Sequence, residues 1–423
     1  MTAVTGTAVA GAVQSVRACA AAAGGAAGSV ATAAPQTVDA ALRAIAGRLA
    51  GPGREPVLAA NAGDVRAGEA GGLPAATLDR LRLDEDRLAG MAHQLRTLAE
   101  VPHPARKRVV RELPGSGAVV EEHRRPVGVI GANFEARPNV VVDVASQLLK
   151  SRNAGVLRTG SAAIGSAAAL VDEVVAPALA AAGLDPAAVQ LVRVPGRETA
   201  RALVSQPDLV PLVILRGSGA STRELTREAA RHGVRTLAHA DGGGVLYLDR
   251  GADRDLALRL VADSLDRLGV CNRLNLLLVA AERWDDLLPD LLGVLDRLGV
   301  RASLPPHDHP LGLEWALQEG REATVTVAPV PGPVEAARLA DAETSGLAAC
   351  VVTADEAAAT AFLGTYAGTG AFWNVSTRLL DGFKLLGVPE TGINVDRVPG
   401  PRGPVTFRDL HLRQFVVTPG GTA

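Results

Sequence analysis

The sequence is poor in cysteine, in aromatic residues and in lysine. Its three cysteines, Cys19, Cys271 and Cys350, are widely spaced among 423 residues, and an odd set of this kind fits a reducing compartment better than a disulfide framework. Aromatic residues make up 3% of the chain, and only three lysines occur. These absences exclude a small disulfide-stapled module and leave each cysteine open to a role as a thiol.

No excess of either charge is present. Lys and Arg total 43 and Asp and Glu total 45, so the net charge is -2, which argues against nucleic acid and anionic membranes as partners. The first 38 residues carry one charge, Arg17, and lack the basic segment and apolar core of a signal peptide. No run of about 18 strongly apolar residues is evident. We therefore expect a cytoplasmic protein without a membrane-spanning helix.

What is present fits a folded protein of two or three domains. Hydrophobic residues account for 48% and charged residues for 21% of the chain, values typical of globular proteins. Apolar residues at helical spacing predict helices over 37–49 and 81–98. Two β-prone runs around a Pro-Gly-Ser-Gly turn predict a hairpin over 109–125, and the β-prone segment 403–419 is a candidate to pair with it.

From Val127 onward, short apolar runs alternate with amphipathic stretches. We expect strands at 127–131, 154–158, 189–194, 209–215 and 234–238, with helices at 139–150, 161–182, 198–205 and 222–232 between them. This alternation predicts right-handed βαβ units and a doubly wound parallel sheet that binds a nucleotide. A second α/β series begins at 244–249, with helices near 253–268 and 284–298, and contains Cys271. The Pro-rich segments 305–310 and 329–333 are interpreted as loops.

Two strand-to-helix turns are candidate phosphate-binding loops. The segment RGSGAS (216–221) follows a buried strand and opens a helix, where free N–H groups attract phosphate, although such a turn needs glycine for backbone reasons alone. In VLRTGSAA (156–163), Arg158 ends a strand at the crevice of the sheet, where it is placed to hold a 2′-phosphate and favour NADP. The alternative for Arg158 is a surface residue at a sheet edge.

Cys271 is the candidate nucleophile. It lies in Gly-Val-Cys-Asn-Arg before an apolar run, where neighbouring N–H groups and Arg273 favour the thiolate; the alternative is a small buried hydrophobic residue. Arg137 and Asn139 open a helix and either bind an anion or position the helix. His307 and His309 supply at most half of a zinc shell, so we expect a solvated loop and no metal site.

Taken together, these motifs resemble the gamma-glutamyl phosphate reductase family of the aldehyde dehydrogenase superfamily. The resemblance covers nearly the whole chain, in the segments 78–92, 125–163, 213–219, 238–249, 269–279 and 372–382. It implies an α/β fold with three parts: an NADP-binding domain (1–108 and 126–240), a catalytic domain (241–390), and a small β oligomerisation element (109–125 and 391–423).

The resemblance also assigns roles to individual residues. Catalytic roles fall on Cys271, Asn133 and Asn272. Cofactor binding falls on Arg158, Gly160, Ser161, Arg216, Gly217, Ser218, Gly219 and Glu322. Binding of substrate or phosphate falls on Arg137, Asn139, His239, Asp241, Asn374, Ser376, Thr377 and Arg378.

The implied activity is reduction of an acyl phosphate by NADPH. The Cys271 thiolate expels phosphate and forms a thioester, hydride transfer then gives the aldehyde, and the N–H of Cys271 and Asn133 are candidate oxyanion donors. Aldehyde dehydrogenases that hydrolyse the thioester use a Glu where this chain has HADGGG, and only Asp241 is available there. This absence favours reduction over oxidation.

Several positions depart from the family pattern, namely Asn275, Leu347 and the Gly243-Gly244 run. If these positions face the acyl group, the substrate is either L-glutamyl 5-phosphate or a related acyl phosphate or thioester, free or attached to a carrier, in a specialised pathway. The alternative to an enzyme is a silent scaffold for the kinase that makes the acyl phosphate. Retention of Cys271, Arg158 and the glycine loop favours the enzyme, and we expect a homo-oligomer, either a dimer or a tetramer.

Overall fold

A computed structural model describes residues 2–217, 219–239, 242–397 and 400–419. Helices fill the first hundred residues, as predicted: α1 (Thr2–Thr32), α2 (Pro35–Ala50), α3 (Arg54–Ala70), α4 (Ala75–Leu81) and α5 (Glu85–Glu100). The start of α5 is fixed by Asp84, whose side chain accepts a hydrogen bond from the N–H of Arg87 at 2.8 Å. The Ala-rich first segment has no periodic pattern of apolar residues but also forms a helix, because alanine has the strongest helix propensity.

A five-stranded parallel sheet forms the first α/β unit. Its strands are β3 (Val129–Phe134), β4 (Ala154–Thr159), β5 (Val189–Leu191), β6 (Leu212–Arg216) and β7 (Arg235–His239), in the order β5-β4-β3-β6-β7. The connecting helices are α6 (Val140–Lys150), α7 (Ile164–Ala169), α8 (Ala176–Ala181), α9 (Arg197–Leu203) and α10 (Gly219–His232). Strands β4 and β5 follow on one side of β3, whereas β6 and β7 follow on its other side. The direction of strand order therefore reverses between β3 and β6. The predicted doubly wound sheet is confirmed.

The helical run Ser161–Ala181 covers this sheet. By length and composition alone it is apolar enough to span a membrane, but half of it is buried inside the protein. Leu170, Val174 and Leu179 belong to the same hydrophobic core as β3 and β4. Packing of this run on a buried sheet accounts for its composition.

The second α/β unit is a six-stranded parallel sheet. Its strands are β8 (Gly244–Leu248), β9 (Leu274–Ala280), β10 (Arg301–Ser303), β11 (Thr324–Val330), β12 (Ala348–Val352) and β13 (Gly370–Trp373), in the order β10-β11-β9-β8-β12-β13. Its helices are α11 (Arg254–Asp263), α12 (Trp284–Arg297), α13 (Pro333–Glu343) and α14 (Glu356–Thr365). Two local expectations are corrected: α11 ends before 268, and the segment 329–333 divides between β11 and α13.

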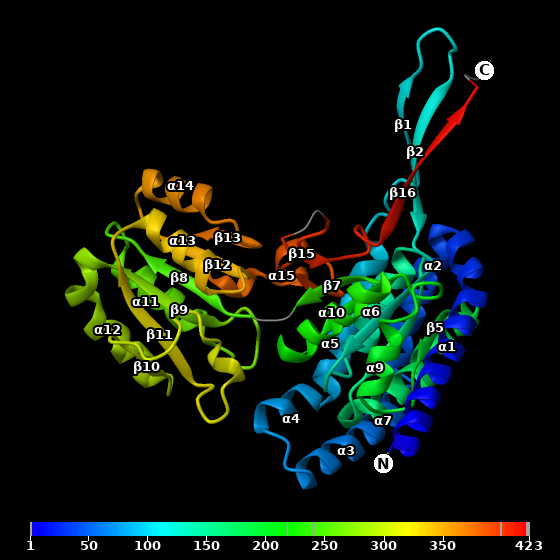
Figure 1. Ribbon diagram of the computed structural model, residues 1–423, viewed down its shortest axis with the longest axis horizontal. Helices are drawn as coiled ribbons and strands as arrows, with labels where there is room; N and C mark the ends of the chain where they lie inside the picture. Colours follow the sequence, from blue (N-terminus) through cyan, green and yellow to red (C-terminus); the bar gives the residue numbers. More distant parts are fainter. Residues whose placement is uncertain (1, 218, 240–241, 398–399, 420–423) are drawn as a thin grey trace.

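A three-stranded antiparallel sheet projects from the body, and we call it the arm (Figure 1). It consists of β1 (Lys107–Glu112), β2 (Val119–Pro126) and β16 (His411–Thr418), in the order β1-β2-β16. The predicted hairpin and its pairing with the end of the chain are confirmed. Between the second sheet and the arm, α15 (Gly382–Leu386), β14 (Gly392–Asn394) and β15 (Gly403–Val405) return to the first sheet, where Asn394 Oδ1 accepts the N–H of Ala238 at 3.3 Å. The domain boundaries stay a prediction.

Candidate active site

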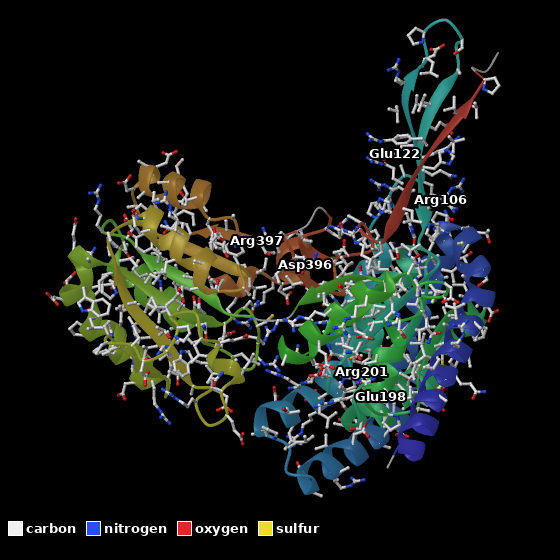
Figure 2. The ribbon with its side chains drawn as sticks, in the orientation of Figure 1. Arg106, Glu122, Glu198, Arg201, Asp396 and Arg397 are labelled. Atoms are coloured by element: carbon white, nitrogen blue, oxygen red, sulfur yellow. The ribbon has the colours of Figure 1, made fainter. Side chains whose placement is uncertain are left out.

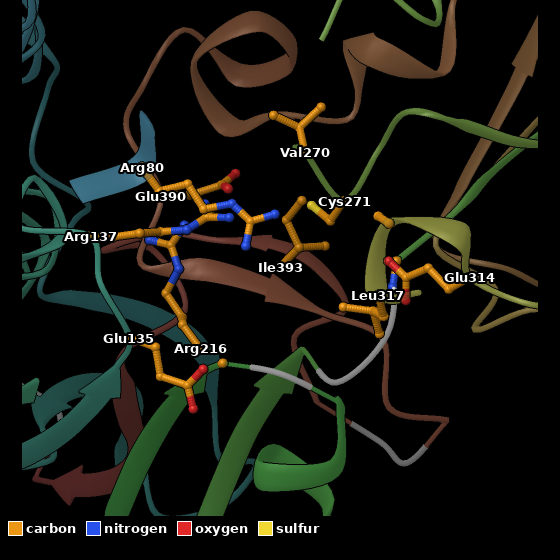
Figure 3. A pocket seen from close by; sticks show the side chains of 13 residues that line it. Arg80, Glu135, Arg137, Arg216, Val270, Cys271, Glu314, Leu317, Glu390 and Ile393 are labelled. Carbon is orange, nitrogen blue, oxygen red and sulfur yellow. Dashed lines mark hydrogen bonds between the residues drawn. The ribbon is translucent and has the colours of Figure 1, made fainter. Parts of the chain in front are cut away.

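A cavity of about 160 Å³ lies between the carboxyl edge of the five-stranded sheet and the loop before β9 (Figure 3). Because the strand order reverses between β3 and β6, this edge is the switch point at which open parallel sheets bind ligands. We call it the Cys271 cavity. Its lining residues are Arg80, Glu135, Arg137, Arg216, Gly217, Gly242, Val270, Cys271, Glu314, Ala316, Leu317, Glu390 and Ile393.

Hydrogen bonds from two neighbouring segments fix the loop that carries Cys271. The carbonyl of Cys271 accepts the N–H of Gly243 at 2.7 Å, and the carbonyl of Asn272 accepts the hydroxyl of Thr377 at 2.9 Å. A Cβ atom added to Gly242 would lie 2.6 Å from the carbonyl oxygen of Cys271. Glycine is therefore required where the two segments pass each other.

Three arginines lie on one side of Cys271, and Glu314 lies on the other (Figure 3). Arg80 reaches from α4 and donates two hydrogen bonds to the carbonyl of Gly269, from Nε at 3.1 Å and from Nη2 at 2.7 Å. Arg137 comes from the turn between β3 and α6, and Arg216 from the end of β6. Burial, with Arg216 and Arg80 nearby, lowers the pKa of Arg137 to about 10. One side of the cavity, next to Cys271, thus concentrates positive charge.

The thiol of Cys271 is held mainly in its neutral form. Burial raises its pKa, and this effect outweighs the opposing attraction of Arg137 and Arg216 for a thiolate. Glu314 raises the pKa further. Formation of the thiolate therefore depends on the balance between these arginines and the nearby carboxylates.

Two partly buried carboxyl groups complete the electrostatic environment. Glu390 lines the cavity and accepts the N–H of Gly382 at 2.5 Å; burial raises its pKa to about 7, although Arg216 acts in the opposite direction. Asp143 on α6 accepts a hydrogen bond from Asn139 Nδ2 at 2.9 Å, and burial raises its pKa to about 6. Both groups therefore change charge near neutral pH.

Comparison with known proteins identifies the family. Residues 77–309 match the aldehyde dehydrogenase family. The chain is 36% identical over 393 residues to a gamma-glutamyl phosphate reductase of Chloroflexus aggregans, and the alignment covers 88% of this chain and 90% of that protein. It is 34% identical over 377 residues to one of Moorella thermoacetica, which covers 87% and 89%.

The chain belongs to the gamma-glutamyl phosphate reductase family. A crystal structure of a gamma-glutamyl phosphate reductase from Thermotoga maritima matches with a TM-score of 0.85 at 25% identity, and it covers 95% of this chain and 98% of that one. The protein is thus an oxidoreductase with the aldehyde dehydrogenase fold.

The family implies a nicotinamide cofactor, and the residues at the switch point fit one. A Cβ atom added to Gly160 would have no neighbour closer than 4.0 Å, so the turn after β4 is open. The turn after β6 leads from Gly217 into α10, which begins at Gly219. Buried Arg216 Nη1 has no hydrogen-bond partner among the described residues. Open main-chain turns and an unsatisfied guanidinium suit a ligand rich in phosphate.

The other predicted cofactor residues have defined places. Arg158 is buried, and its guanidinium donates to Asn133 Oδ1 at 3.0 Å, to Thr199 Oγ1 at 3.2 Å and to the carbonyl of Gly196 at 2.5 Å. Asn133 therefore contacts Arg158 and does not line the Cys271 cavity. Ser161 is exposed at the start of a short helix, Ser161–Ala163. The carbonyl of Glu322 accepts from Arg273 Nη1, and Glu322 is also outside the cavity lining.

The residues predicted for substrate divide into two groups. Arg137 lines the cavity, and Asn139 orients Asp143. Four others support the Cys271 loop or its surroundings: Asn374 bonds to the main chain of Thr353, Ser376 to Ser264, Thr377 to Asn272, and Arg378 to Asp266 and Asn272. Asn272 donates to the carbonyl of Leu380 at 3.0 Å. Ser218, Asp241 and the side chain of His239 lie outside the described residues.

Packing contacts account for the positions that depart from the family pattern. Asn275 is buried; its Nδ2 donates to the carbonyl of Leu313 at 2.9 Å and its Oδ1 accepts the N–H of Trp315 at 3.0 Å, which fixes the segment bearing Glu314. Leu347 is fully buried in a small apolar cluster against which Cys271 packs. A Cβ atom on Gly244 would lie 2.6 Å from Thr377 Oγ1. None of these three residues lines the described cavity.

Sequence reasoning missed Arg80, Glu314 and Glu390. Arg80 lies on a short helix 189 residues before Gly269, with no motif linking the two segments. Glu314 follows the Pro-rich loop and accepts the N–H of Gly242 at 2.8 Å. Glu390 lies in the loop between α15 and β14, and no motif links it to Cys271. The proximity of Glu314 and Glu390 to Cys271 becomes visible only in the folded structure.

Proposed function

We propose that this protein reduces L-glutamyl 5-phosphate to the semialdehyde and inorganic phosphate, with NADPH as the reductant. The observation that supports this proposal is the arrangement of three arginines around a cysteine at the switch point of a parallel sheet. A thiol supplies a nucleophile, and clustered guanidinium groups bind and stabilise a phosphoryl leaving group. The names of the relatives agree with this substrate.

In the first step, Cys271 Sγ forms a bond to the acyl carbon and the bond from that carbon to the phosphate oxygen breaks. Phosphate leaves with the bonding electron pair, and Arg137 and Arg216 stabilise its negative charge. The N–H of Cys271 is the main-chain donor assigned to the oxyanion. The product is an acyl thioester on Cys271.

The proton of the Cys271 thiol must leave before or during this attack. We assign it to Glu390, a carboxyl group of the same cavity whose pKa of about 7 lets it accept a proton at neutral pH. Binding of an anionic phosphate between the arginines reduces their ability to stabilise a thiolate. The proton acceptor therefore has to be a separate residue.

Gly160, Gly217, Gly219 and Arg158 are the residues we assign to the cofactor. When bound, reduced nicotinamide supplies the hydride that converts the thioester to the aldehyde and releases the Cys271 thiolate. Arg158, at the end of β4, is assigned to the 2′-phosphate that distinguishes NADPH from NADH. The cavity itself holds the acyl group in place and limits access of water.

The assay that tests this function is the reverse reaction. Purified protein is supplied with NADP, inorganic phosphate and glutamate 5-semialdehyde, and formation of reduced cofactor is followed by absorbance. We expect formation that requires phosphate and is lost in Cys271→Ser. A protein without phosphate-dependent turnover on any of a panel of free, N-acylated and carrier-linked semialdehydes would contradict the proposal. Turnover restricted to a modified semialdehyde would instead assign it a specialised substrate.

Further proposals concern the setting of the enzyme. We infer a cytoplasmic homo-oligomer joined through the arm, on which Val109, Phe415 and Val417 are 64%, 56% and 57% exposed. Phe415→Asp should lower the mass measured by light scattering.

The kinase that forms the acyl phosphate is a second proposed partner, because its product is labile and benefits from direct transfer.

A further inference from the structure

A second cavity, of about 290 Å³, lies where the arm joins the body, and we call it the arm-base cavity. Figure 2 labels Arg106, one of its lining residues, at the base of the arm. Residues from the start of α2, the segment between α5 and β1, the end of α6, β2 and the start of β16 meet there. It shares no lining residue with the Cys271 cavity.

Five arginine and lysine side chains line the arm-base cavity: Arg106, Arg124, Arg125, Lys150 and Arg152. Lys150 Nζ is 2.7 Å from Asp39 Oδ1, and the same oxygen is 2.9 Å from His103 Nε2. In the described parts of the chain, none of the four arginines has a carboxylate within 4.0 Å. Within ion-pair distance, and among the described residues, the five cations of this cavity therefore share a single carboxylate, that of Asp39.

Two of these cations are buried, which makes the imbalance costly. The side chain of Lys150 is 0% exposed, and Arg152 is buried with its Nη1 donating to the carbonyl of Ala33. Arg152 also has a left-handed backbone, with φ at 67°. Lys150 is paired with Asp39, whereas Arg152 has no carboxylate within 4.0 Å among the described residues, and a buried charge without a counter-charge is unfavourable in a folded protein. The structure retains them at a cavity large enough for a small molecule.

The two histidines of the cavity respond to the same positive field. The pKa of His103 is lowered, first by burial and then by Lys150 and Arg152, although Asp39 acts in the opposite direction. The pKa of His411 is lowered by burial and by Arg124, against the weaker influence of Asp409 and Glu122. Both rings therefore favour the neutral form near pH 7; the one N–H of His103 is donated to Asp39, whereas no carboxylate lies within 4.0 Å of His411 among the described residues.

Apolar groups complete the walls. Pro35, Pro104, Pro126 and Phe407 line the cavity between the cations. We propose that the arm-base cavity binds a small anion that carries at least two phosphate or carboxylate groups and has a short apolar body. Arg124 and Arg125 on the arm and the buried Lys150 and Arg152 on the body contact its charged ends, so the bound anion ties the arm to the body.

Inorganic pyrophosphate and citrate are the probes, and isothermal calorimetry on the intact protein measures binding. Because pyrophosphate also suits the Cys271 cavity, the variants decide the location. Arg124 and Arg125 are exposed, and the interaction with another side chain given up is the hydrogen bond from Arg125 Nε to Gln414, so we expect Arg124→Gln with Arg125→Gln to preserve the fold; circular dichroism of the variant checks this. Arg111→Gln is the matched control, because Arg111 is exposed on β1 outside the cavity.

We expect wild-type protein to bind at least one probe, and the double variant to bind it at least tenfold more weakly. The control should bind as the wild type does, and all three proteins should keep the same reductase activity. Tighter binding of pyrophosphate would assign the cavity to a phosphate ligand, and tighter binding of citrate would assign it to a carboxylate ligand. The proposal is overturned if neither probe binds better than chloride at matched ionic strength, or if the control loses as much affinity as the double variant.

Discussion

The Cys271 cavity and the arm-base cavity are both rich in arginine but differ in how their charge is balanced. Around Cys271, Arg80, Arg137 and Arg216 share their surroundings with the carboxyl groups of Glu135, Glu314 and Glu390, and with nearby Asp143. At the arm-base cavity, Lys150 is paired with Asp39, whereas none of the four arginines has a carboxylate within 4.0 Å among the described residues. A mixed set of charges allows protons to move at neutral pH, whereas an unbalanced set favours static binding of an anion.

The largest effect should come from Cys271→Ser, which removes the nucleophile and little else. The hydroxyl is a far weaker nucleophile in a site built around a thiol, so kcat should fall about 10³-fold or more. Thermal stabilisation by NADPH should be unchanged, since Cys271 is not assigned to the cofactor. Turnover within tenfold of the wild type would rule out the thioester mechanism.

Arg216→Met should have the next largest effect, and it directly tests the comparison between the cavities. The variant loses the guanidinium whose Nη1 has no hydrogen-bond partner among the described residues. This loss should raise the activation free energy by about 2–5 kcal/mol, so that kcat/KM falls roughly 30-fold or more. Arg216→Lys should recover part of this loss by retaining the charge. Arg124→Gln, in the arm-base cavity, should leave kcat/KM unchanged; an equal loss there would show that the effect is one of general charge.

Much of the fold could be predicted from the sequence because it depends on local pattern. Buried parallel strands such as 127–131 and 154–158 are continuous apolar runs, and helices separate them at regular intervals. The arm was predicted from two β-prone runs and a turn. The limits of α11 were not, because the residues after Asp263 retain a helical composition while Ser264 and Ser376 join through a hydrogen bond of 2.9 Å.

The candidate site was predictable only where one segment holds all the information. Cys271 and Arg137 lie in local motifs and do line the cavity. Arg80 and Glu390 reach it from opposite ends of the chain, and no spacing rule links them to Cys271. Thr377 and Asn272 were assigned to chemistry by resemblance, but a motif does not distinguish a residue that contacts substrate from one that holds the loop through a hydrogen bond.

Glu390→Gln should produce a smaller effect, on stability rather than on turnover alone. The pKa of Glu390 rises from 4.5 to about 7 on folding, so the folded state holds the proton more tightly than the unfolded state. Stability from this group is present below pH 4.5 and is lost as pH rises toward 7. Between pH 4.5 and pH 7, the free energy of unfolding of the wild type should therefore fall by about 1–3 kcal/mol. The free energy of unfolding of Glu390→Gln should not show this fall.

Urea unfolding at pH 5 and pH 8 measures this difference. Asp381→Asn is a comparison variant that removes a neighbouring carboxyl group, which should lower the pKa of Glu390. An identical pH dependence of the unfolding midpoint in wild type and Glu390→Gln would contradict the raised pKa. It would also remove Glu390 as the acceptor of the Cys271 proton.

The last effect, confined to the binding of one cofactor, is expected at Arg158, whose guanidinium is already held by three neighbours. Its Nε, Nη1 and Nη2 each already have a partner, in Thr199, Asn133 and Gly196, so two N–H groups remain for a 2′-phosphate. Arg158→Ala should weaken NADPH by about 1.5–3 kcal/mol, the value of a hydrogen bond to a charged group, and should hardly change the affinity for NADH. Fluorescence titration with both cofactors measures the two affinities.

Thr199→Val is the matched control: it removes one partner of Arg158 but no charge, so its effect on NADPH affinity should be weaker than that of Arg158→Ala. If NADPH and NADH weaken equally in Arg158→Ala, the residue only supports the turn at Gly196, and the selection of NADPH must come from elsewhere at the edge of the sheet.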